Sequence, residues 1–365
     1  MRVGIDARIL GHKRSGIGVY VINLVEQFLK YKDLEILLFC DRPIDEEYRL
    51  VTGKVKTIIF GEGRKKYWSQ FLLPAELKKH GINVYHATWN NAVPFFTLVP
   101  CVLTVHDIIP LVVKGYFKNI RKRFKYILLM RSAVSRARRI ITVSDATKHD
   151  LLEHFKICQD KIITVYEAVA SAGNSVVIEK SGIEGDYIVN VGSFDKRRNA
   201  DILIKAFKRF VKNTNTKLKL VLTGGYDRFP EEIKRLKSLS TELGLDDSIV
   251  FTNYLVQRKM QAVLQGACMM VHLSLYEGFC FPVLEAMQLG VPVIASDRGS
   301  LLEVAGDAAI LIDPTDEAAA AEVMSSLLND ANLRNSLVKK GYDRIKKFSW
   351  EETARQTKEI YEKVS

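Results

Sequence analysis

The feature that most constrains the fold is a repeated alternation of short apolar runs with longer amphipathic segments. The apolar runs predict buried strands, and the segments between them carry apolar residues at helical spacing. Strands and helices that alternate in this way form parallel sheets covered by helices. The predicted strands are 2–7, 35–40, 56–60, 84–86, 101–106, 139–144, 161–166, 187–191, 217–223, 248–252, 269–273, 291–296 and 309–313. The predicted helices are 19–31, 68–79, 118–137, 145–155, 199–212, 230–243, 256–266, 282–289, 315–329, 332–348 and 349–365.

The alternation breaks once, after residue 166, in a stretch that contains Ala-Ser-Ala-Gly-Asn-Ser and Lys-Ser-Gly-Ile-Glu-Gly. A chain of 365 residues is long enough for two domains of ordinary size. We therefore predict an α/β protein with Rossmann-like domains at 1–168 and 186–348, a linker at 169–185, and a terminal segment at 349–365. Ligands bind such sheets at the carboxyl ends of the strands, so two facing domains would place the site in a deep cleft between them.

The excess of positive over negative charge lies entirely in the first half of the chain. The whole sequence has 54 Lys and Arg against 42 Asp and Glu, a net charge of +12; residues 1–175 carry 28 and 16 of these, and the remainder carries 26 of each. Ten basic residues and no acidic residue lie between Lys114 and Arg139. This segment predicts a peripheral contact with an anionic membrane, although a core helix with a solvated basic face would show the same pattern. Nucleic-acid binding is not expected, because no recognised motif accompanies the charge.

Other bulk features favour a cytoplasmic protein. No apolar run reaches the roughly 18–20 residues that a membrane span requires. Asp6 interrupts the apolar start, which therefore predicts a strand and not a signal peptide. The five cysteines are scattered and form no Cys-x-x-Cys pair, so neither a zinc site nor a disulfide framework is indicated.

Two carboxylates, Glu277 and Glu285, bracket a turn that leads from a predicted strand into a predicted helix. Pro282 suits the first turn of that helix. Free N–H groups at a helix N-terminus bind anions such as a diphosphate. A carboxylate beside such an anion would repel it, so these two side chains suit sugar hydroxyls. Either glutamate alone could equally well cap or solvate the helix.

Three further loops follow predicted strands. Arg197 and Arg198 end a run of three cations after the strand 187–191, and Arg can grip a phosphate through two parallel N–H bonds. A solvated basic loop is the alternative. Gly16 and Gly18 would let the backbone approach a phosphate or sugar closely, or would simply form a tight turn. His106 ends the strand 101–106 and would face the ligand, unless it is a core histidine bonded to Asp107 or to backbone.

Together these stretches resemble retaining GT-B glycosyltransferases, in particular glycosyltransferase family 4. The resemblance covers nearly the whole chain and is strongest over residues 187–313. Glu277 and Glu285 match the Glu-x7-Glu signature, with Cys280 where the family commonly has Gly, and Arg198 stands where the family has Lys. The resemblance implies a catalytic role for His106, Glu277, Arg197 and Arg198. It implies donor binding by Gly16, Gly18, Ser193, Asn253, Tyr254, Leu255, Gly278, Phe279, Cys280, Phe281, Pro282, Val283 and Glu285.

The resemblance also implies a reaction. A sugar would pass from a nucleotide-diphosphate sugar to a saccharide or lipid-linked saccharide acceptor, with retention at the anomeric carbon, in polysaccharide or lipopolysaccharide assembly. Neither a cofactor nor a metal is expected, because the chain has no Asp-x-Asp and protein cations would stabilise the diphosphate. The terminal helix would cross back to the first domain. A sugar-nucleotide epimerase of the same fold, or a basic membrane- or nucleic-acid-binding protein with an inactive cleft, are the alternatives.

Overall fold

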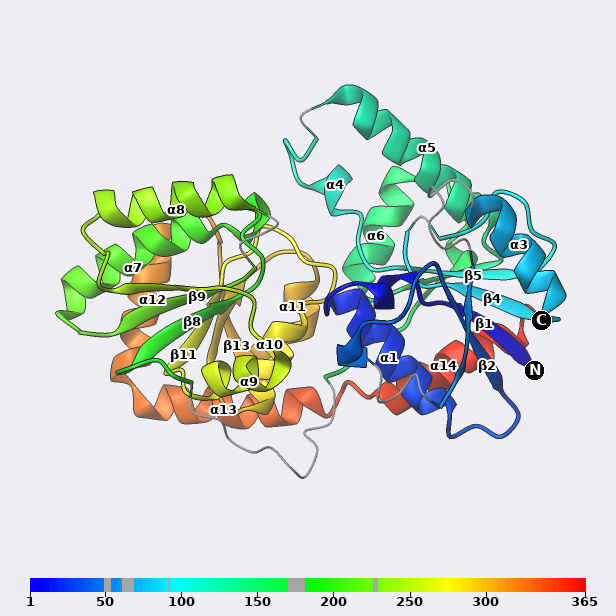
Figure 1. Ribbon diagram of the computed structural model, residues 1–365. Helices are drawn as coiled ribbons and strands as arrows, with labels where there is room; N and C mark the ends of the chain where they lie inside the picture. The colour runs from blue at the N-terminus through cyan, green and yellow to red at the C-terminus, as the bar shows by residue number, and fades with distance from the viewer. Residues whose placement is uncertain (49–53, 61–68, 91, 118, 170–180, 226–228) are drawn as a thin grey trace. The chain divides into compact units, whose positions relative to one another are not determined.

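The computed structural model describes residues 1–48, 54–60, 69–90, 92–117, 119–169, 181–225 and 229–365 (Figure 1). The chain divides into two compact units. Unit 1 comprises Met1–Ala170 and Ser349–Ser365, and unit 2 comprises Ser171–Phe348. Most of the linker predicted at 169–185 lies outside the described residues.

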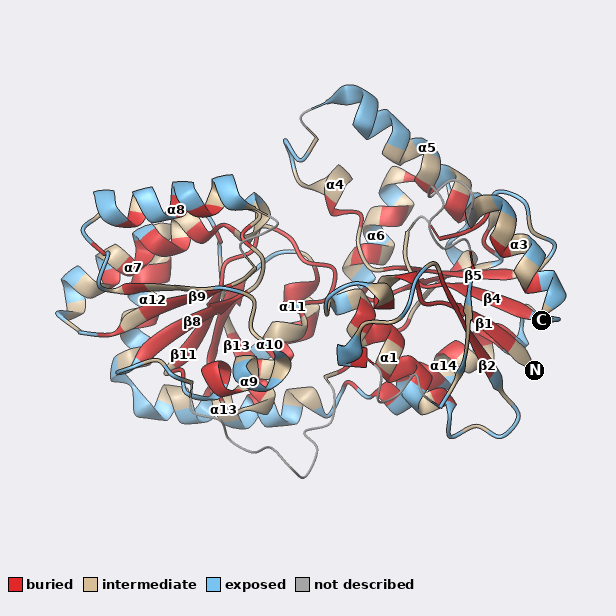
Figure 2. Ribbon diagram, viewed as in Figure 1, coloured by how far each residue is buried: buried red, intermediate tan, exposed pale blue. Residues whose placement is uncertain are grey.

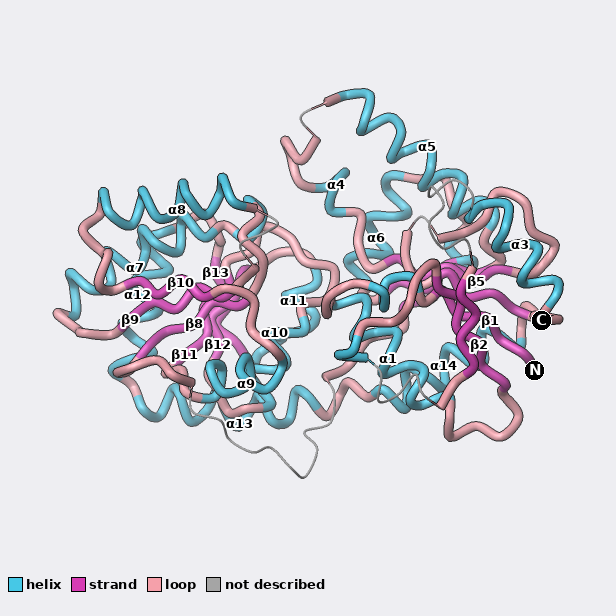
Figure 3. Tube along the Cα trace, in the orientation of Figure 1, coloured by secondary structure: helices cyan, strands magenta, loops and turns pink. Residues whose placement is uncertain are grey.

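The core of unit 1 is a parallel sheet of seven strands in the order β3-β2-β1-β4-β5-β6-β7 (Figures 1 and 3). Its strands are β1 (Arg2–Asp6), β2 (Glu35–Cys40), β3 (Lys56–Ile59), β4 (Val84–Ala87), β5 (Cys101–Val105), β6 (Arg139–Thr142) and β7 (Ile162–Thr164). Parallel strands with helices on both faces are buried on both sides, and this explains why they read as continuous apolar runs. Each predicted strand of this half is confirmed, with ends that differ by no more than two residues.

Helices cover both faces of this sheet. On one face α3 (Ser69–Lys79), α5 (Ile120–Arg136) and α6 (Asp145–His154) contribute apolar residues to a single core cluster. On the other face α1 (Gly16–Phe28) packs against α14 (Trp350–Glu362) (Figure 1). Side chains of Ser15, Asn119 and Ser144 accept hydrogen bonds at the N-termini of α1, α5 and α6, as expected of N-cap residues. The short helix α4 (Ile109–Val112) was not predicted, because one turn leaves no periodic pattern.

The terminal helix α14 is joined to unit 1 by buried polar bonds as well as by packing. The Tyr361 hydroxyl lies 2.6 Å from Nδ1 of His86 on β4, and both residues are fully buried. The Thr353 hydroxyl donates to the carbonyl oxygen of Tyr166 at 2.6 Å. Because a buried polar group without a partner is costly, these bonds fix the position of α14 on the sheet.

Unit 2 contains a parallel sheet of six strands in the order β10-β9-β8-β11-β12-β13. Its strands, all of them predicted, are β8 (Tyr187–Val191), β9 (Lys219–Thr223), β10 (Ile249–Thr252), β11 (Met269–His272), β12 (Val293–Ser296) and β13 (Ala309–Ile312). Helices α7 (Ala200–Thr214), α8 (Pro230–Glu242) and α12 (Glu317–Asn329) bury apolar faces in its main core cluster. Helix α10 (Phe281–Gln288) packs against α9 (Gln257–Gln265), α11 (Ser300–Ala305) and α13 (Ala331–Ile345).

Strand order reverses once in each sheet, between β1 and β4 in unit 1 and between β8 and β11 in unit 2. The loops that follow these strands diverge to opposite faces, and the space between them is where open α/β sheets bind ligands. Burial is concentrated along the strands and on the inner sides of the helices (Figure 2). Among the described helices, none combines the length and the apolar character that a membrane span requires.

Candidate active site

The loops after β8 and β11 bring the predicted arginines and the first glutamate together at the switch point of unit 2. Arg197 Nη1 donates to Glu277 Oε2 at 2.8 Å, and Arg198 Nη1 donates to Glu277 Oε1. These residues are 80 and 79 positions apart in the chain. The adjacency of β8 and β11 in the sheet explains why they meet.

Backbone contacts hold the two loops in register. The Leu275 N–H donates to the carbonyl oxygen of Arg197 at 2.7 Å, and Arg197 Nη1 also donates to the carbonyl oxygen of Tyr276 at 3.1 Å. On the Glu277 side, the hydroxyl of Ser300 donates to the Glu277 carbonyl oxygen at 3.0 Å. The charged groups therefore sit on backbone that is fixed from both sides.

The arginine loop is shaped by its own polar residues. The side chain of Asp195 accepts a hydrogen bond from the N–H of Arg197 at 3.2 Å, which caps the short turn Lys196–Arg198. Ser193, one of the predicted donor residues, donates to Asp195 at 2.6 Å. A Cβ at Gly192 would lie 3.1 Å from Nε of Arg198, so a larger residue here would force the guanidinium to shift.

Glu277 is a buried carboxylate with more positive than negative charge around it. Its side chain is 6% exposed, and those of Arg197 and Arg198 are 17% and 15% exposed. Burial alone would raise the pKa of the Glu277 carboxyl, but the two guanidiniums hold that pKa well below its usual range. Arg198 Nε is buried and makes no hydrogen bond with the part of the chain that the structure describes. This leaves a cationic donor that an anionic ligand could satisfy.

His272, at the end of β11, completes the cluster and was not singled out from the sequence. Its Nε2 lies 3.1 Å from Glu277 Oε1, 3.0 Å from Arg198 Nη1 and 3.3 Å from the sulfur of Cys280. Burial is the main cause of the lowered pKa of His272, which favours the neutral ring. The only sequence signal was one histidine within an otherwise apolar strand, which by itself does not separate a site residue from a core residue.

Helix α10 begins where the sequence predicted an anion-binding turn. Cys280 is its N-cap, with a left-handed backbone (φ +77°, ψ 68°), and no side chain caps the helix. Gly278 and Phe279 precede this position, and Phe281 and Pro282 form the first turn. Glu285 lies at the fifth position of α10 and is partly buried, and Val283 is buried against the core. An uncapped helix N-terminus beside Arg197 and Arg198 can bind a diphosphate.

The remaining predicted donor residues of unit 2 lie farther along the same edge of the sheet. Asn253, Tyr254 and Leu255 follow β10, the outermost strand on this side, and precede α9. The N–H of Tyr254 donates to the side chain of Asn253 at 2.8 Å. Strand β10 is two positions from β8 in the sheet. The loop therefore lies at the same edge of the sheet as the cluster of Arg197, Arg198 and Glu277, but it is not part of that cluster.

In unit 1, each ring nitrogen of His106 lies close to an oxygen atom. Nε2 lies 2.9 Å from the carbonyl oxygen of Thr88, and Nδ1 lies 3.1 Å from Oε1 of Glu167. Burial would lower the pKa of His106, but Glu167 and the Thr88 carbonyl raise it overall. For the carboxyl of Glu167 burial acts in the other direction and raises the pKa, although His106 opposes that effect. Sequence analysis placed Glu167 at the break before the linker and so missed this buried partner.

The predicted glycine loop forms the N-terminus of α1. The Gly18 N–H donates to the Ser15 hydroxyl at 3.2 Å, and the Ser15 N–H donates to the Tyr48 hydroxyl at 3.0 Å. A Cβ on Gly18 would lie 2.2 Å from the Tyr48 hydroxyl oxygen, so only glycine fits here. Gly16 is the first residue of the helix.

A second buried cluster at the β1–β4 switch point was not predicted. Asp6, fully buried at the end of β1, accepts hydrogen bonds from Arg8 Nε at 3.0 Å, from the Tyr85 hydroxyl at 3.0 Å and from Trp89 Nε1 at 3.2 Å. The Arg8 guanidinium lies 5.5 Å from the centroid of the Trp89 ring. The cluster fixes an aromatic ring and a cation at the carboxyl edge of this sheet, beside the strands that lead to His106.

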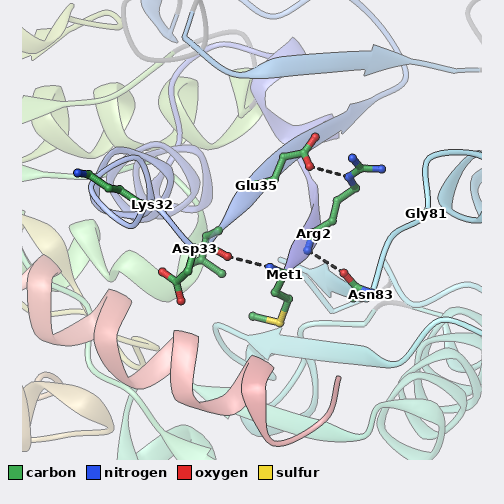
Figure 4. Close-up of a pocket in the computed structure, with 8 residues that line it drawn as sticks. Met1, Arg2, Lys32, Asp33, Glu35, Gly81 and Asn83 are labelled. Carbon is green, nitrogen blue, oxygen red and sulfur yellow. Dashed lines mark hydrogen bonds and ion pairs between the residues drawn. The ribbon is translucent and has the colours of Figure 1, made fainter.

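Two other groups of residues have the general features of a ligand site. A hollow lined by residues such as Met1, Arg2 and Asn83 lies at the amino ends of the strands, opposite to the ligand edge, and its polar groups bond to one another (Figure 4). His272, Glu277 and Cys280 lie close enough to hold one metal ion. A cation there would meet the Arg198 guanidinium, and burial raises the pKa of the Cys280 thiol, so we assign no metal to this cluster.

Comparison with known proteins agrees with this geometry. The family described as Glycosyltransferase Family 4 matches residues 14–171, and the family described as Glycosyl transferases group 1 matches residues 176–344. The O-antigen chain mannosyltransferase B of Escherichia coli is 28% identical, with 95% of this chain and 96% of the relative covered. The serotype-specific mannosyltransferase WbdA of Escherichia coli is 26% identical over 72% of this chain. The matched part is about a third (33%) of the length of WbdA.

Solved structures show the same fold. Anabaena Alr3699/HepE, solved in complex with UDP and glucose, superimposes with a TM-score of 0.80 at 16% identity, with both chains covered completely (100%). Sucrose-phosphate synthase from Thermosynechococcus elongatus gives a TM-score of 0.78 at 19% identity, with 99% of this chain and 98% of that chain covered. The family matches, the two parallel sheets and these relatives agree with the resemblance seen in the Glu277–Glu285 stretch. The chain therefore belongs to the glycosyltransferases of family 4, with the GT-B fold.

Proposed function

We propose that the chain transfers a hexose from a nucleotide-diphosphate sugar to a saccharide or lipid-linked saccharide acceptor, with retention at the anomeric carbon and without a metal ion. The observation that carries this proposal is the cluster of Arg197, Arg198 and Glu277 beside the N-terminus of α10. This cluster places two guanidiniums, which can bind a diphosphate, beside a buried carboxylate, which can bind sugar hydroxyls.

In this proposal Arg197 and Arg198 stabilise the diphosphate as the leaving group. When the bond between the anomeric carbon and the phosphate oxygen breaks, negative charge develops on that oxygen. Preorganised donors aimed at such a charge lower the barrier most where water is excluded. Arg197 and Arg198 are largely buried, and Arg198 Nε has no partner among the described residues, so a phosphate oxygen would satisfy it. The protein's own cations thus take the place of a metal.

Glu277 acts on the sugar and not as a nucleophile. The two guanidiniums hold its pKa well below the usual range, which makes the carboxylate a weak base and a weak nucleophile. As the arginines turn towards the diphosphate, the carboxylate oxygens become available to sugar hydroxyls. The acceptor oxygen then attacks the anomeric carbon from the face that the diphosphate leaves, and its proton passes to the departing phosphate oxygen. No covalent intermediate with the protein is formed.

The other predicted residues have supporting roles in this proposal. Glu285 accepts the ribose hydroxyls, and the backbone of Asn253, Tyr254 and Leu255 contacts the base. His106, held by Thr88 and Glu167, contacts the donor sugar. Mannose is the first sugar to test, because two of the relatives that cover most of this chain are named mannosyltransferases.

The first experiment is calorimetric titration of the full chain with GDP-, UDP- and dTDP-linked sugars in the presence of EDTA. We expect one donor nucleotide to bind and Glu285→Ala to weaken that binding about tenfold or more, the loss of a good charged hydrogen bond. Glu322→Ala, an exposed glutamate on α12, is the matched control and leaves binding unchanged. Binding that requires Mg²⁺ would refute the role given to Arg197 and Arg198.

The reaction is tested with the donor that binds. Incubation with a saccharide acceptor gives a product whose anomeric configuration NMR can assign, and retention is the expected result. Incubation with the donor alone is the second arm, because an epimerase would convert the sugar nucleotide without any acceptor. Such conversion, or an inverted product, would overturn the proposed reaction.

A further inference from the structure

Exposed apolar side chains gather in the same part of unit 1 that carries the excess charge. Thirteen large hydrophobic residues are exposed among those the structure describes, and eight of them lie between positions 71 and 128. They are Phe71, Phe95, Phe96, Leu98, Tyr116, Ile120, Phe124 and Leu128. Three of them, Ile120, Phe124 and Leu128, belong to α5 and are therefore close enough in space to form one exposed apolar surface, which isolated exposed residues do not.

Helix α5 carries the most ordered part of this surface. Ile120, Phe124 and Leu128 are 73%, 62% and 48% exposed and follow one another at intervals of four residues, so they lie along one side of the helix. Every residue from 119 to 125 is exposed, and this half of α5 extends beyond the covered part of the unit (Figure 2). The second half is anchored in the core by Met130, Ala133 and Val134. The packed C-terminal half of α5 therefore fixes the position of the exposed N-terminal half.

Cations surround this apolar stripe. Arg121, Lys122, Arg123, Lys125 and Arg131 are all exposed and lie on α5 among or beside the three apolar residues. None of the five forms an ion pair with a described residue. Like charges this close repel one another, so the helix gains from any surface that supplies negative charge.

We propose that α5 docks on a bilayer that contains anionic phospholipids, with Ile120, Phe124 and Leu128 in the interface and the cations beside lipid phosphates. A bilayer meets both requirements at once, because its interface takes up apolar side chains and its anionic lipids attract Lys and Arg. A second copy of the chain would bring the same uncompensated cations against each other. A nucleic acid would pair with the cations but would leave the apolar stripe in water. The proposal does not depend on the reaction proposed above.

The expected effects follow from the general strength of electrostatic and apolar contacts with a bilayer. Each basic residue near an anionic surface strengthens binding roughly fivefold at low salt. Withdrawal of about 55 Å² of apolar surface from water corresponds to a tenfold change in partitioning. Both contributions are therefore large enough to measure separately by substitution.

The test is co-sedimentation of the full chain with vesicles of phosphatidylcholine alone or mixed with phosphatidylglycerol, with no sugar nucleotide present. We expect binding only to the mixed vesicles, and weaker binding at high salt because salt screens the charges. The double variant Phe124→Ser/Leu128→Ser should lower the partition coefficient at least tenfold. The double variant Lys122→Glu/Lys125→Glu should lower it at least a hundredfold. All four positions are exposed, so these variants should fold.

Matched control variants lie in unit 2. Lys205→Glu/Lys212→Glu makes the same charge change on the exposed side of α7, and Leu302→Ser/Tyr342→Ser removes exposed apolar residues from α11 and α13. If both controls weaken binding as much as the α5 variants, the contact is non-specific and the proposal fails. It also fails if the Phe124→Ser/Leu128→Ser protein binds like the wild type, because charge alone would then explain the binding. A dimer of the wild-type chain that this variant dissociates, seen by sedimentation without vesicles, would identify a second copy as the occupant.

Discussion

His86, which is buried beneath α14, should make the stability of unit 1 depend on pH. Substitution of this residue can separate its contribution from those of other titrating groups. His86 is fully buried, with Nδ1 2.6 Å from the Tyr361 hydroxyl and Nε2 2.7 Å from the Thr104 hydroxyl. Burial, assisted by the positive charge of His106, lowers the pKa of His86 from 6.5 to about 3. The ring is therefore neutral in the folded chain at pH values where it would be protonated in the unfolded chain.

The sign and size of the effect follow from this difference. Below pH 6.5 the unfolded chain binds a proton at His86 that the folded chain does not bind until about pH 3, so acid favours unfolding over that interval. One pH unit is worth about 1.4 kcal/mol, so a change from about pH 7.5 to about pH 4.5 lowers the stability by between about 2 and 3 kcal/mol. Other groups also titrate in this range, and the difference between two variants removes most of their contribution.

The measurement is urea unfolding of wild type and His86→Asn at several pH values, followed by tryptophan fluorescence. The three tryptophans, at positions 68, 89 and 350, all belong to unit 1, so the signal reports this unit. At neutral pH the variant should be less stable by about 1–3 kcal/mol, because one buried hydroxyl loses its partner. At about pH 4.5 that deficit should disappear or change sign.

His12→Asn replaces an exposed histidine in the same unit and is the matched control variant, measured at the same pH values. A deficit of His86→Asn that stays constant within about 0.5 kcal/mol between the two pH values would refute the reasoning. It would mean that His86 is already protonated in the folded chain or that the unfolded state protects it.

Two other substitutions test close approaches in the candidate site. Gly18→Ala should destabilise unit 1 by about 1–3 kcal/mol in the same assay, because its Cβ would meet the Tyr48 hydroxyl, and Tyr48→Phe should recover part of this loss. No recovery would point to a backbone effect at the start of α1. Glu277→Gln should lower stability by about 3–5 kcal/mol, because Arg198 then lies buried without a carboxylate partner and Arg197 keeps only Asp195, 3.3 Å away. Inorganic pyrophosphate should raise the melting temperature of this variant more than that of wild type. An equal response of both proteins to pyrophosphate would contradict the placement of the anion at these arginines.

Much of the fold could be predicted because parallel strands are buried on both faces. Most strands are then nearly continuous apolar runs, and their ends are commonly followed by a polar residue or a glycine. Helices with a clear apolar stripe were equally visible. One-turn elements such as α4 and α11 were missed, since a few residues contain no period.

The candidate site was harder to predict, because its contacts join distant loops. The order of the strands decides that Arg197 and Glu277 meet, and nothing in the local pattern specifies that β8 lies beside β11. The grouping of these residues therefore came from resemblance to a family. His272 and Glu167 were missed for a related reason: an ionisable residue in an apolar run or near a chain break shows its partner only after folding.

Cys280 stands where the family commonly has glycine, and the structure shows how this residue is accommodated. A residue other than glycine at φ +77° is strained by about 1 kcal/mol, yet the Cys280 side chain is buried and its sulfur lies 3.3 Å from His272. Cys280→Ala and Cys280→Gly both remove that sulfur, but only the second relieves the strain. We therefore expect the glycine variant to be more stable than the alanine variant by about 1 kcal/mol, the reverse of the usual order in a helix or strand. Circular dichroism during urea unfolding measures this difference, because unit 2 contains no tryptophan. An alanine variant as stable as the glycine variant would show that the turn before α10 relaxes, and that its amides are not held rigidly for an anion.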